Sequence, residues 1–266
     1  MTLPQIVERA LEEDVGSGDV TTNLCVPADR KANGSFLVRE PIVVAGVELL
    51  PLFYDDIDLK APDGACLEAG KEIATVRGYA RALLTRERVA LNFLQHLSGI
   101  ATRARKYVDA VAGTGCRILD TRKTIPGLRE LEKMAVRAGG ATNHRMGLFD
   151  AVLIKNNHIT AAGGVRAALA ATRNANVPVQ IEVRTRAELE EALDCGAKKL
   201  LLDNLNPAEA KEWIRYIAGR ATVELSGGIT LDTVRAYAET GADFISAGAI
   251  THSTRAVDIH FHLELE

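Results

Sequence analysis

The chain has 266 residues, of which 47% are hydrophobic and 25% charged, and its formal net charge is −3. That length can bury a substantial core, and the composition is that of an ordinary soluble globular protein. An acidic balance argues against broad nucleic-acid binding, and no apolar run reaches the roughly 18 residues of a membrane span. We therefore expect a cytoplasmic protein with no nucleic-acid and no membrane partner.

The opening segment, MTLPQIVERALEEDV, lacks the charged and apolar regions of a signal peptide and predicts an amphipathic helix instead. Strand-like runs follow at 32–40, 42–47 and 72–78, and a long helical pattern covers about 80–111. The four cysteines form no CxxC pair, which favours buried free thiols in a reducing compartment. These signals predict a first α/β domain over residues 1–105.

A repeated sequence pattern begins near residue 116: a short apolar run ends abruptly in polar or glycine residues. The six runs lie at 117–123, 151–158, 179–185, 199–204, 222–228 and 243–249. Near-continuous apolar strands that alternate with capped helices are typical of a parallel sheet covered on both sides. The fold class is therefore α/β, with an incomplete parallel β/α barrel of about six strands over residues 106–255. The alternating segment 256–266 predicts a closing strand that returns to the first domain.

Positive charge collects in one part of this acidic chain. Residues 117–155 carry eight Lys and Arg against four Asp and Glu, a balance of +4, so the remainder carries −7. Arg122, Lys123 and Lys155 directly follow apolar strands, where the active site of a parallel barrel lies. Cations that converge repel one another, and a resident anion would offset that cost. We therefore expect a ligand with several negative charges.

Two glycine-rich loops, Ser226-Gly227-Gly228 and Ala247-Gly248-Ala249, follow the last two strands. Such loops form the phosphate cradle of this architecture, although tight turns also use glycine for purely structural reasons. Glu182 and Asp203 end two neighbouring strands. This pair could act as acid and base, hold a divalent metal, accept hydrogen bonds from sugar hydroxyls, or form internal salt bridges.

Other candidates favour ordinary structural roles. Arg129, Lys133 and Arg137 recur at helical spacing, which predicts a solvated helix face. His96 lies in an apolar helix, where a buried and hydrogen-bonded histidine is the simpler interpretation.

Longer motifs carry a specific resemblance. DTRKTIPGLR, GGATNHRMGLFDAVLIKNNH, ELSGG and SAGAITHS, with the earlier EDVGSGDVTT and ERVALNFLQHLSGIAT, cover essentially the whole chain. In these motifs the chain resembles the quinolinate phosphoribosyltransferase family. The resemblance implies an open-faced α/β sandwich followed by an incomplete barrel. It also implies a homodimer and conversion of quinolinate and 5-phosphoribosyl 1-diphosphate, with Mg²⁺, to nicotinate mononucleotide, diphosphate and CO₂.

The resemblance further implies roles for individual residues. Arg122, Lys123, His144 and Arg145 would bind the quinolinate carboxylates, with Arg88 contributed by the other subunit, and Thr121 would also bind substrate. Lys155, Glu182 and Asp203 would form the catalytic group. The two carboxylates would hold ribose hydroxyls and Mg²⁺, itself held mainly through the diphosphate. The remaining positions would bind phosphate groups: Ser226, Gly227, Gly228, Ala247, Gly248, Ala249 and His252.

Three alternatives stay open at this stage. A relative associated with molybdate-transport operons shares the fold and the motifs. Lys155 could instead be the Schiff-base lysine of an aldolase-type barrel, since it ends a barrel strand. A non-enzymatic binding module is disfavoured, because it would not need cations and carboxylates that converge at strand ends.

Overall fold

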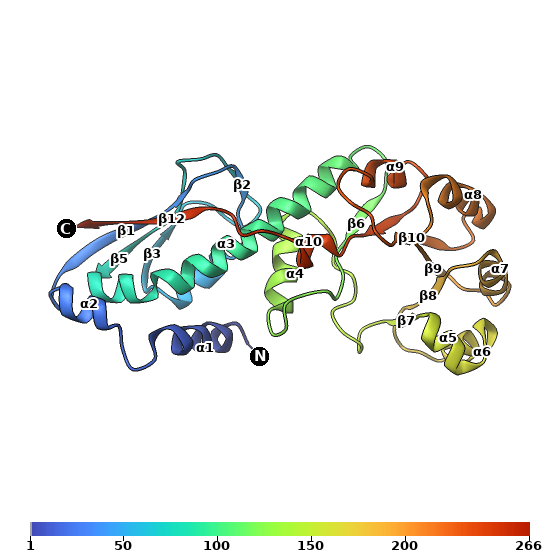
Figure 1. Cartoon of the computed structure of the whole chain (residues 1–266), viewed down its shortest axis with the longest axis horizontal. Coiled ribbons are helices and arrows are strands. Elements are labelled where there is room, and N and C mark those ends of the chain that lie inside the picture. Colours follow the sequence, from blue (N-terminus) through green and yellow to red (C-terminus); the bar gives the residue numbers. More distant parts are fainter. Residues whose placement is uncertain (1) are drawn as a thin grey trace. The chain divides into compact units, whose positions relative to one another are not determined.

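The computed structural model describes residues 2–266 (Figure 1). The chain divides into two compact units. Unit 1 holds the residues up to 105 together with 125–140 and 254–266, and unit 2 holds 106–124 and 141–253. The long helix α3 (Ala80–Ala110) begins in unit 1 and ends in unit 2.

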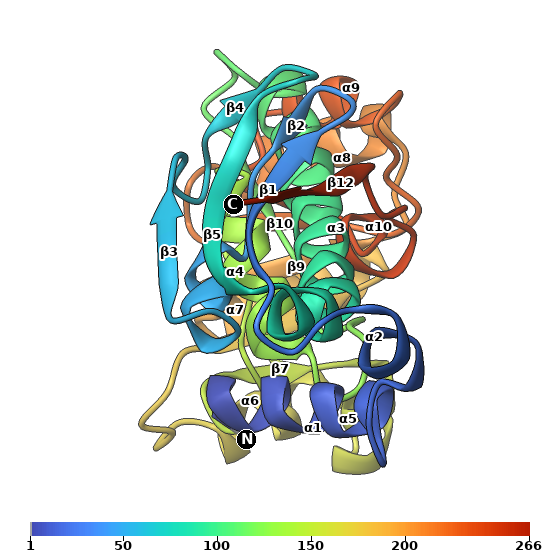
Figure 2. The same cartoon turned by 90° about the vertical axis from the view of Figure 1, so that its left-hand side faces the viewer.

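Unit 1 is built on an antiparallel sheet with the order β12-β1-β5-β3 (Figure 2). Its strands are β1 (Lys31–Val38), β3 (Asp56–Leu59), β5 (Glu72–Tyr79) and β12 (Ile259–Leu265). Alternate residues of β1 are buried, as expected for a sheet with one covered face. On the covered face the rings of Phe36 and Phe261 meet edge to face, with centroids 4.9 Å apart. The last strand of the chain therefore pairs with the first.

Smaller elements complete unit 1. They are α1 (Leu3–Val15), α2 (Val20–Cys25), β2 (Ile42–Val43), η1 (Val47–Leu52), β4 (Cys66–Leu67) and α4 (Arg129–Ala138). The strand expected at 42–47 is only two residues long, because Gly46 adopts a φ of 94° and the chain enters a 3₁₀ helix at Val47.

Helix α4 groups with unit 1, although its residues lie within the range expected for the barrel. It packs closely on α3: a Cβ atom at Gly139 would lie 2.4 Å from the carbonyl oxygen of Ala101. Glu132 is buried and its Oε1 lies 3.0 Å from Nε2 of His96, so the predicted hydrogen bond of His96 is confirmed, although the histidine side chain is 23% exposed and not buried. The prediction of a solvated face is wrong for Lys133, which is fully buried on this helix.

Unit 2 contains a six-stranded parallel sheet with the order β6-β11-β10-β9-β8-β7. The strands are β6 (Arg117–Leu119), β7 (Val152–Ile154), β8 (Val179–Val183), β9 (Lys199–Asp203), β10 (Thr222–Ser226) and β11 (Phe244–Ser246). The intervening helices lie outside the strands (Figure 1). They are α5 (Asn156–Ala162), α6 (Val165–Ala171), α7 (Arg186–Asp194), α8 (Pro207–Ile217) and α9 (Val234–Ala238), and the short α10 (Ala249–His252) follows the last strand, β11. The predicted α/β class with an incomplete six-stranded barrel is confirmed.

The sheet stays open between β6 and β7, and side chains close part of the gap. Leu119, the last residue of β6, forms an isolated parallel backbone bridge with Thr142. The Arg145 guanidinium then donates from Nη1 to the carbonyl oxygen of Ala151, just before β7, at 3.1 Å. This incomplete closure places the loop that contains His144 and Arg145 at the edge of the barrel interior.

Local signals explain why the strand ends coincide. The Asn206 side chain accepts hydrogen bonds from the amides of Ala208 and Glu209 at 3.0 Å, and the Thr185 hydroxyl accepts from Glu188 at 3.1 Å. These caps begin α8 and α7 soon after β9 and β8 end. Each strand therefore delivers its last residue to the same edge of the sheet.

The four cysteines are free, but the expectation that they are buried is wrong for Cys25 and Cys66, which are exposed. Cys116 is buried, and burial together with the nearby Asp243 charge raises the pKa of its thiol to about 12. Within residues 2–266, no helix combines the length and hydropathy needed to cross a membrane.

Candidate active site

A cavity of about 770 Å³ opens at the carboxyl ends of the unit 2 strands. It brings together all but one of the residues predicted for the site. The predicted residues that line it are Thr121, Arg122, Lys123, His144, Arg145, Lys155, Glu182, Asp203, Ser226, Gly227, Gly228, Ala247, Gly248, Ala249 and His252. The exception, Arg88, lies exposed on α3 in unit 1.

Lys155 and Glu182 form an ion pair at the ends of β7 and β8. The Lys155 ammonium lies 3.3 Å from Oε2 of Glu182; the lysine side chain is half exposed, whereas the glutamate is buried. A Schiff-base lysine must be neutral to attack a carbonyl, and such lysines are desolvated or placed beside another cation. Lys155 is half exposed and lies beside a carboxylate, so the geometry favours a binding role over that of an amine nucleophile.

Asp203 ends β9 inside the same cavity. Burial raises the pKa of this carboxyl, and the charge of Glu182 raises it further, while Lys155 opposes the shift. Two carboxylates therefore face the cavity at close range with incomplete compensation. A positively charged group bound there would be stabilised by both.

Asn204 was not predicted and supports Asp203 directly. Its side-chain amide donates to Oδ2 of Asp203 at 2.6 Å. Asn204 adopts a left-handed φ of 58°, and a Cβ atom at Gly227 would lie 2.3 Å from the Asn204 amide oxygen. The glycine of the SGG loop is thus required by a close approach of two loops as well as by its own φ of 101°. An Asn after an Asp at a strand end is the signal that could have found this residue.

The cationic side of the cavity carries Arg122, Lys123 and Arg145. Burial lowers the pKa of Arg145, the neighbouring Arg122 charge lowers it further, and Asp150 opposes the shift. The backbone here is held by buried contacts: the Thr251 hydroxyl donates to the carbonyl oxygen of Lys123 at 2.7 Å. Repulsion between the Arg122 and Arg145 guanidinium groups is a cost that a bound anion would offset.

A network of carboxylates holds the loop that bears Arg145. The fully buried Asp120 accepts from the Asn143 side chain and from the His144 amide, both at 2.7 Å. Asp150 accepts from the Met146 amide at 2.7 Å and closes the other end of the loop. The loop is therefore preorganised by charge-assisted hydrogen bonds.

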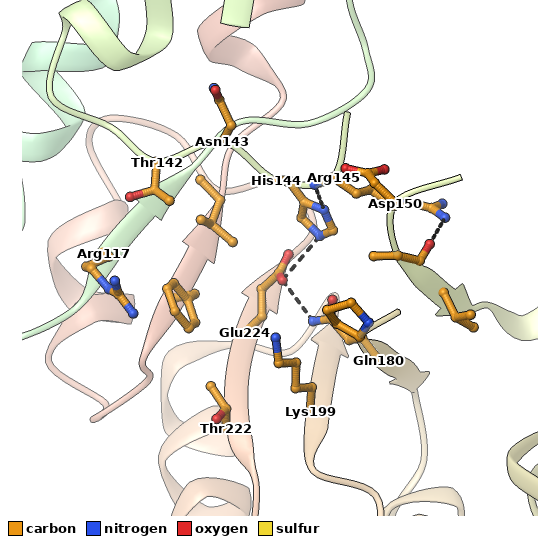
Figure 3. Close-up of a pocket in the computed structure, with 15 residues that line it drawn as sticks. Arg117, Thr142, Asn143, His144, Arg145, Asp150, Gln180, Lys199, Thr222 and Glu224 are labelled. Carbon is orange, nitrogen blue, oxygen red and sulfur yellow. Dashed lines mark hydrogen bonds and ion pairs between the residues drawn. The ribbon is translucent and has the colours of Figure 1, made fainter. Parts of the chain in front are cut away.

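Glu224, in the middle of β10, is a second residue that the sequence analysis missed. Its side chain is 3% exposed, and its Oε2 accepts from Nε2 of Gln180 at 2.8 Å and lies 3.4 Å from Nε2 of His144 (Figure 3). Burial alone would raise the pKa of this carboxyl, but its contacts with His144 and Gln180 hold the pKa below the usual range. The signal was available: Glu224 lies two residues before Ser226 and so faces the same side of its strand.

The acidic residues define what metal the site could take. In the described part of the chain, no three or more His, Cys, Asp and Glu side chains gather as a metal site. Glu182 and Asp203 are two oxygen donors beside a cationic cavity. Mg²⁺ is typically held by one or two carboxylates together with substrate phosphates and water, and this donor set fits such an ion.

Comparison with known proteins agrees with this architecture. The family models described as quinolinate phosphoribosyl transferase match the chain at residues 19–98 for the N-terminal domain and 100–262 for the C-terminal domain. A nicotinate-nucleotide pyrophosphorylase (carboxylating) of Mycobacterium leprae is 43% identical over 97% of this chain and 95% of its own length.

Solved structures extend the agreement to the fold. The Streptococcus pyogenes protein NadC is 38% identical, with a TM-score of 0.93 over 100% of this chain and 99% of its own. A nicotinate-nucleotide pyrophosphorylase of Ehrlichia chaffeensis is 36% identical, with a TM-score of 0.95 over 99% of both chains. Fold and site together define an enzyme that binds anionic ligands at the open end of an incomplete β/α barrel. The chain belongs to the quinolinate phosphoribosyltransferase family.

Proposed function

We propose that the protein transfers the phosphoribosyl group of 5-phosphoribosyl 1-diphosphate to quinolinate and releases CO₂. The products are nicotinate mononucleotide and diphosphate, so the enzyme is a pentosyltransferase of NAD biosynthesis. One observation carries the proposal beyond family membership. A single cavity holds repelling guanidinium groups at one part of its wall and repelling carboxylates at another.

Quinolinate is a pyridine with two adjacent carboxylates. Arg122, Lys123 and Arg145 supply the positive charge that binds them, and Thr121 and His144 lie beside these cations. The planar guanidinium fork suits a carboxylate, whereas Lys123 acts as a point charge. Binding of the dianion offsets the repulsion between Arg122 and Arg145.

The phosphoribosyl donor occupies the rest of the cavity. Lys155 contacts its phosphates, and the loops Ser226-Gly227-Gly228 and Ala247-Gly248-Ala249, with His252, surround them. Glycine at these positions lets the backbone approach a phosphate closely. Glu182 and Asp203 accept hydrogen bonds from the ribose hydroxyls.

Transfer proceeds by electrostatic stabilisation. When the bond between C1′ and the diphosphate breaks, positive charge develops on the ribose, and Glu182 and Asp203 stabilise that charge without having to reorganise. Bound Mg²⁺, held by the same two carboxylates and mainly by the diphosphate, would neutralise charge on the leaving group. The quinolinate nitrogen then bonds to C1′.

Decarboxylation follows from the new bond. The ring nitrogen becomes cationic, so the electron pair left at C2 when the bond to CO₂ breaks is stabilised by the adjacent positive charge. A proton replaces CO₂ at C2. Because the ring itself holds the electrons, no covalent intermediate with the enzyme is required, in keeping with the ion-paired Lys155.

We further propose that the protein is a homodimer in the cytoplasm and that Arg88 completes the site of the other subunit. Arg88 is exposed on α3 in unit 1, so its side chain is available to a partner. Its guanidinium would add one more cation around the quinolinate carboxylates.

A turnover assay tests the proposal. Protein is mixed with phosphoribosyl diphosphate, Mg²⁺ and either quinolinate or nicotinate, and nicotinate mononucleotide and CO₂ are followed. We expect nicotinate mononucleotide and CO₂ in the reaction with quinolinate, and no product in the reaction with nicotinate. Folded protein that gives none with quinolinate would overturn the assignment and bring forward the relative associated with molybdate-transport operons. A borohydride-trapped adduct with substrate would instead support the Schiff-base alternative for Lys155.

A further inference from the structure

A second cavity of about 370 Å³ lies at the amino ends of the same strands (Figure 3). Residues that begin the strands line it, among them Arg117, Lys199, Thr222 and Phe244. Three residues line both this cavity and the larger one. They are His144, Arg145 and Glu224, so these side chains separate the two cavities inside the barrel.

Glu224 is an unusual residue for this position, because a buried carboxylate costs several kcal/mol unless it is well compensated. Gln180 donates to its Oε2 at 2.8 Å, and His144 lies against the same atom at 3.4 Å. The Oε1 atom is buried and has no hydrogen bond of standard geometry with the described residues, although the Ser246 hydroxyl also helps to lower the pKa of this carboxyl. A glutamine could fill the same space without the cost of a charge, so the presence of a carboxylate calls for a role.

The contacts of His144 define the state of its ring. The Arg145 amide donates to Nδ1 of His144 at 2.7 Å. An amide nitrogen can only donate, so Nδ1 must present its lone pair and the ring proton lies on Nε2. Nε2 in turn faces Glu224. A carboxylate opposite Nε2 favours this tautomer, just as carboxylates fix the tautomer of histidines in other active sites.

These contacts form a chain from the barrel core to the substrate pocket. Glu224 contacts the His144 ring, the ring accepts the Arg145 amide, and Arg145 lines the larger cavity. We propose that Glu224 is a positioning residue for the quinolinate pocket, which acts on Arg145 through the orientation and tautomer of His144. This inference rests on the proposed function, and it assigns His144 a neutral, orienting role in place of a cationic one.

Glu224→Gln is the first test, since it removes the charge and keeps the size. The kcat/KM for quinolinate is expected to fall about 10- to 100-fold, the usual cost of losing the partner that orients a binding residue. The KM for phosphoribosyl diphosphate is expected to stay within about twofold, because its pocket is built by other residues. A wild-type kcat/KM for quinolinate in folded Glu224→Gln would overturn the proposal.

Lys199→Ala is the matched control. Lys199 lines the same smaller cavity from the start of β9 and belongs to no part of the chain of contacts. Its substitution is expected to leave both kinetic constants unchanged. Equal losses in Lys199→Ala and Glu224→Gln would show a general effect of the cavity and overturn the specific role of Glu224.

A double-mutant cycle separates positioning from a merely structural effect. In a His144→Asn background, Glu224→Gln is expected to cost less than about twofold, since its effect passes through the missing ring. The full loss in that background would overturn the proposal, because Glu224 would then act by another route.

A readout independent of turnover keeps this test separate from the proposed function. Nitrogen NMR of labelled protein is expected to show His144 with its proton on Nε2 in wild type and a mixture of tautomers in Glu224→Gln. A protonated Nδ1 in wild type would overturn the inference even if quinolinate is turned over. If quinolinate is not turned over and the NMR result holds, the proposed function fails while the Glu224–His144 link stands.

Discussion

The two ends of the unit 2 barrel share six strands and differ in how their charges are arranged. At the carboxyl end, charged side chains converge: Lys155 pairs with Glu182, Asp203 faces the same carboxylate, and Arg122 lies close enough to Arg145 to lower its pKa. At the amino end two cations have separate surroundings. Arg117 stacks over the ring of Phe244, with its guanidinium carbon 4.4 Å from the centroid, and Lys199 is exposed.

The difference shows what distinguishes a site from a charged surface. Both ends carry cations and both are hollowed, so neither feature alone identifies the chemistry. At the carboxyl end like charges lie near one another, an arrangement that costs free energy until a ligand of opposite charge arrives. Groups perturbed by burial and by specific neighbours concentrate at functional sites for this reason.

The largest expected effect is that of Asp203→Asn, which removes a charge that the carboxyl end holds at a cost. We expect kcat to fall about 10²- to 10³-fold, the usual loss when one preorganised electrostatic group is removed. Steady-state kinetics with quinolinate and phosphoribosyl diphosphate measure it. A variant with wild-type kcat would remove Asp203 from the mechanism.

The same substitution is expected to stabilise the fold. The pKa of Asp203 is raised in the folded protein by burial and by Glu182, so its ionised form costs stability above that pKa. Asp203→Asn should therefore unfold at a higher temperature than wild type at pH 7. The difference between the two unfolding temperatures should shrink as the pH falls and Asp203 of the wild type becomes protonated. A difference that widens on acidification would contradict the assigned direction of the shift.

Arg145→Ala tests the cationic side of the same cavity. We expect kcat/KM for quinolinate to fall by a factor that corresponds to about 2–4 kcal/mol of lost transition-state stabilisation. One partner of a charged contact is removed, and the substrate carboxylate is left unpaired. Arg166→Ala is the control, since the Arg166 side chain is 68% exposed. The loss of the Arg145 contact with Ala151 is monitored by thermal unfolding. A near-wild-type kcat/KM in Arg145→Ala would contradict the assignment of the quinolinate pocket.

Mixing two inactive variants tests whether the site is completed by another subunit. Arg88→Ala and Lys155→Ala should each be inactive alone. In a hybrid dimer one site carries both changes and the other carries neither, so random exchange should restore about a quarter of wild-type activity. Native mass spectrometry confirms the exchange. Exchange without recovered activity would show that Arg88 does not serve the partner's site.

The comparison also explains which features could be predicted from the sequence. Lys155, Glu182 and Asp203 each end an apolar run, and a parallel sheet brings all such ends to one edge, so their meeting in one cavity follows from the repeat alone. Glu224 lies inside its run; its spacing from Ser226 indicates which face of the strand it occupies, but not that it will meet His144 and Gln180. Lys133 shows the related limit: helical spacing defines a face of a helix, but only tertiary packing decides whether that face meets water.

The smallest expected effect lies at the amino end of the barrel, and it tests whether that end is separate from the chemistry. Arg117→Ala removes a cation that is stabilised by its own contact with Phe244. Loss of this stacking should lower the free energy of unfolding by about 0.5–1 kcal/mol, while kcat/KM stays within about twofold of wild type. Chemical denaturation and steady-state kinetics measure the two quantities on the same preparation. If activity instead falls tenfold with stability retained, charge at the amino end acts on the reaction, and convergence of like charges no longer separates the two ends of the barrel.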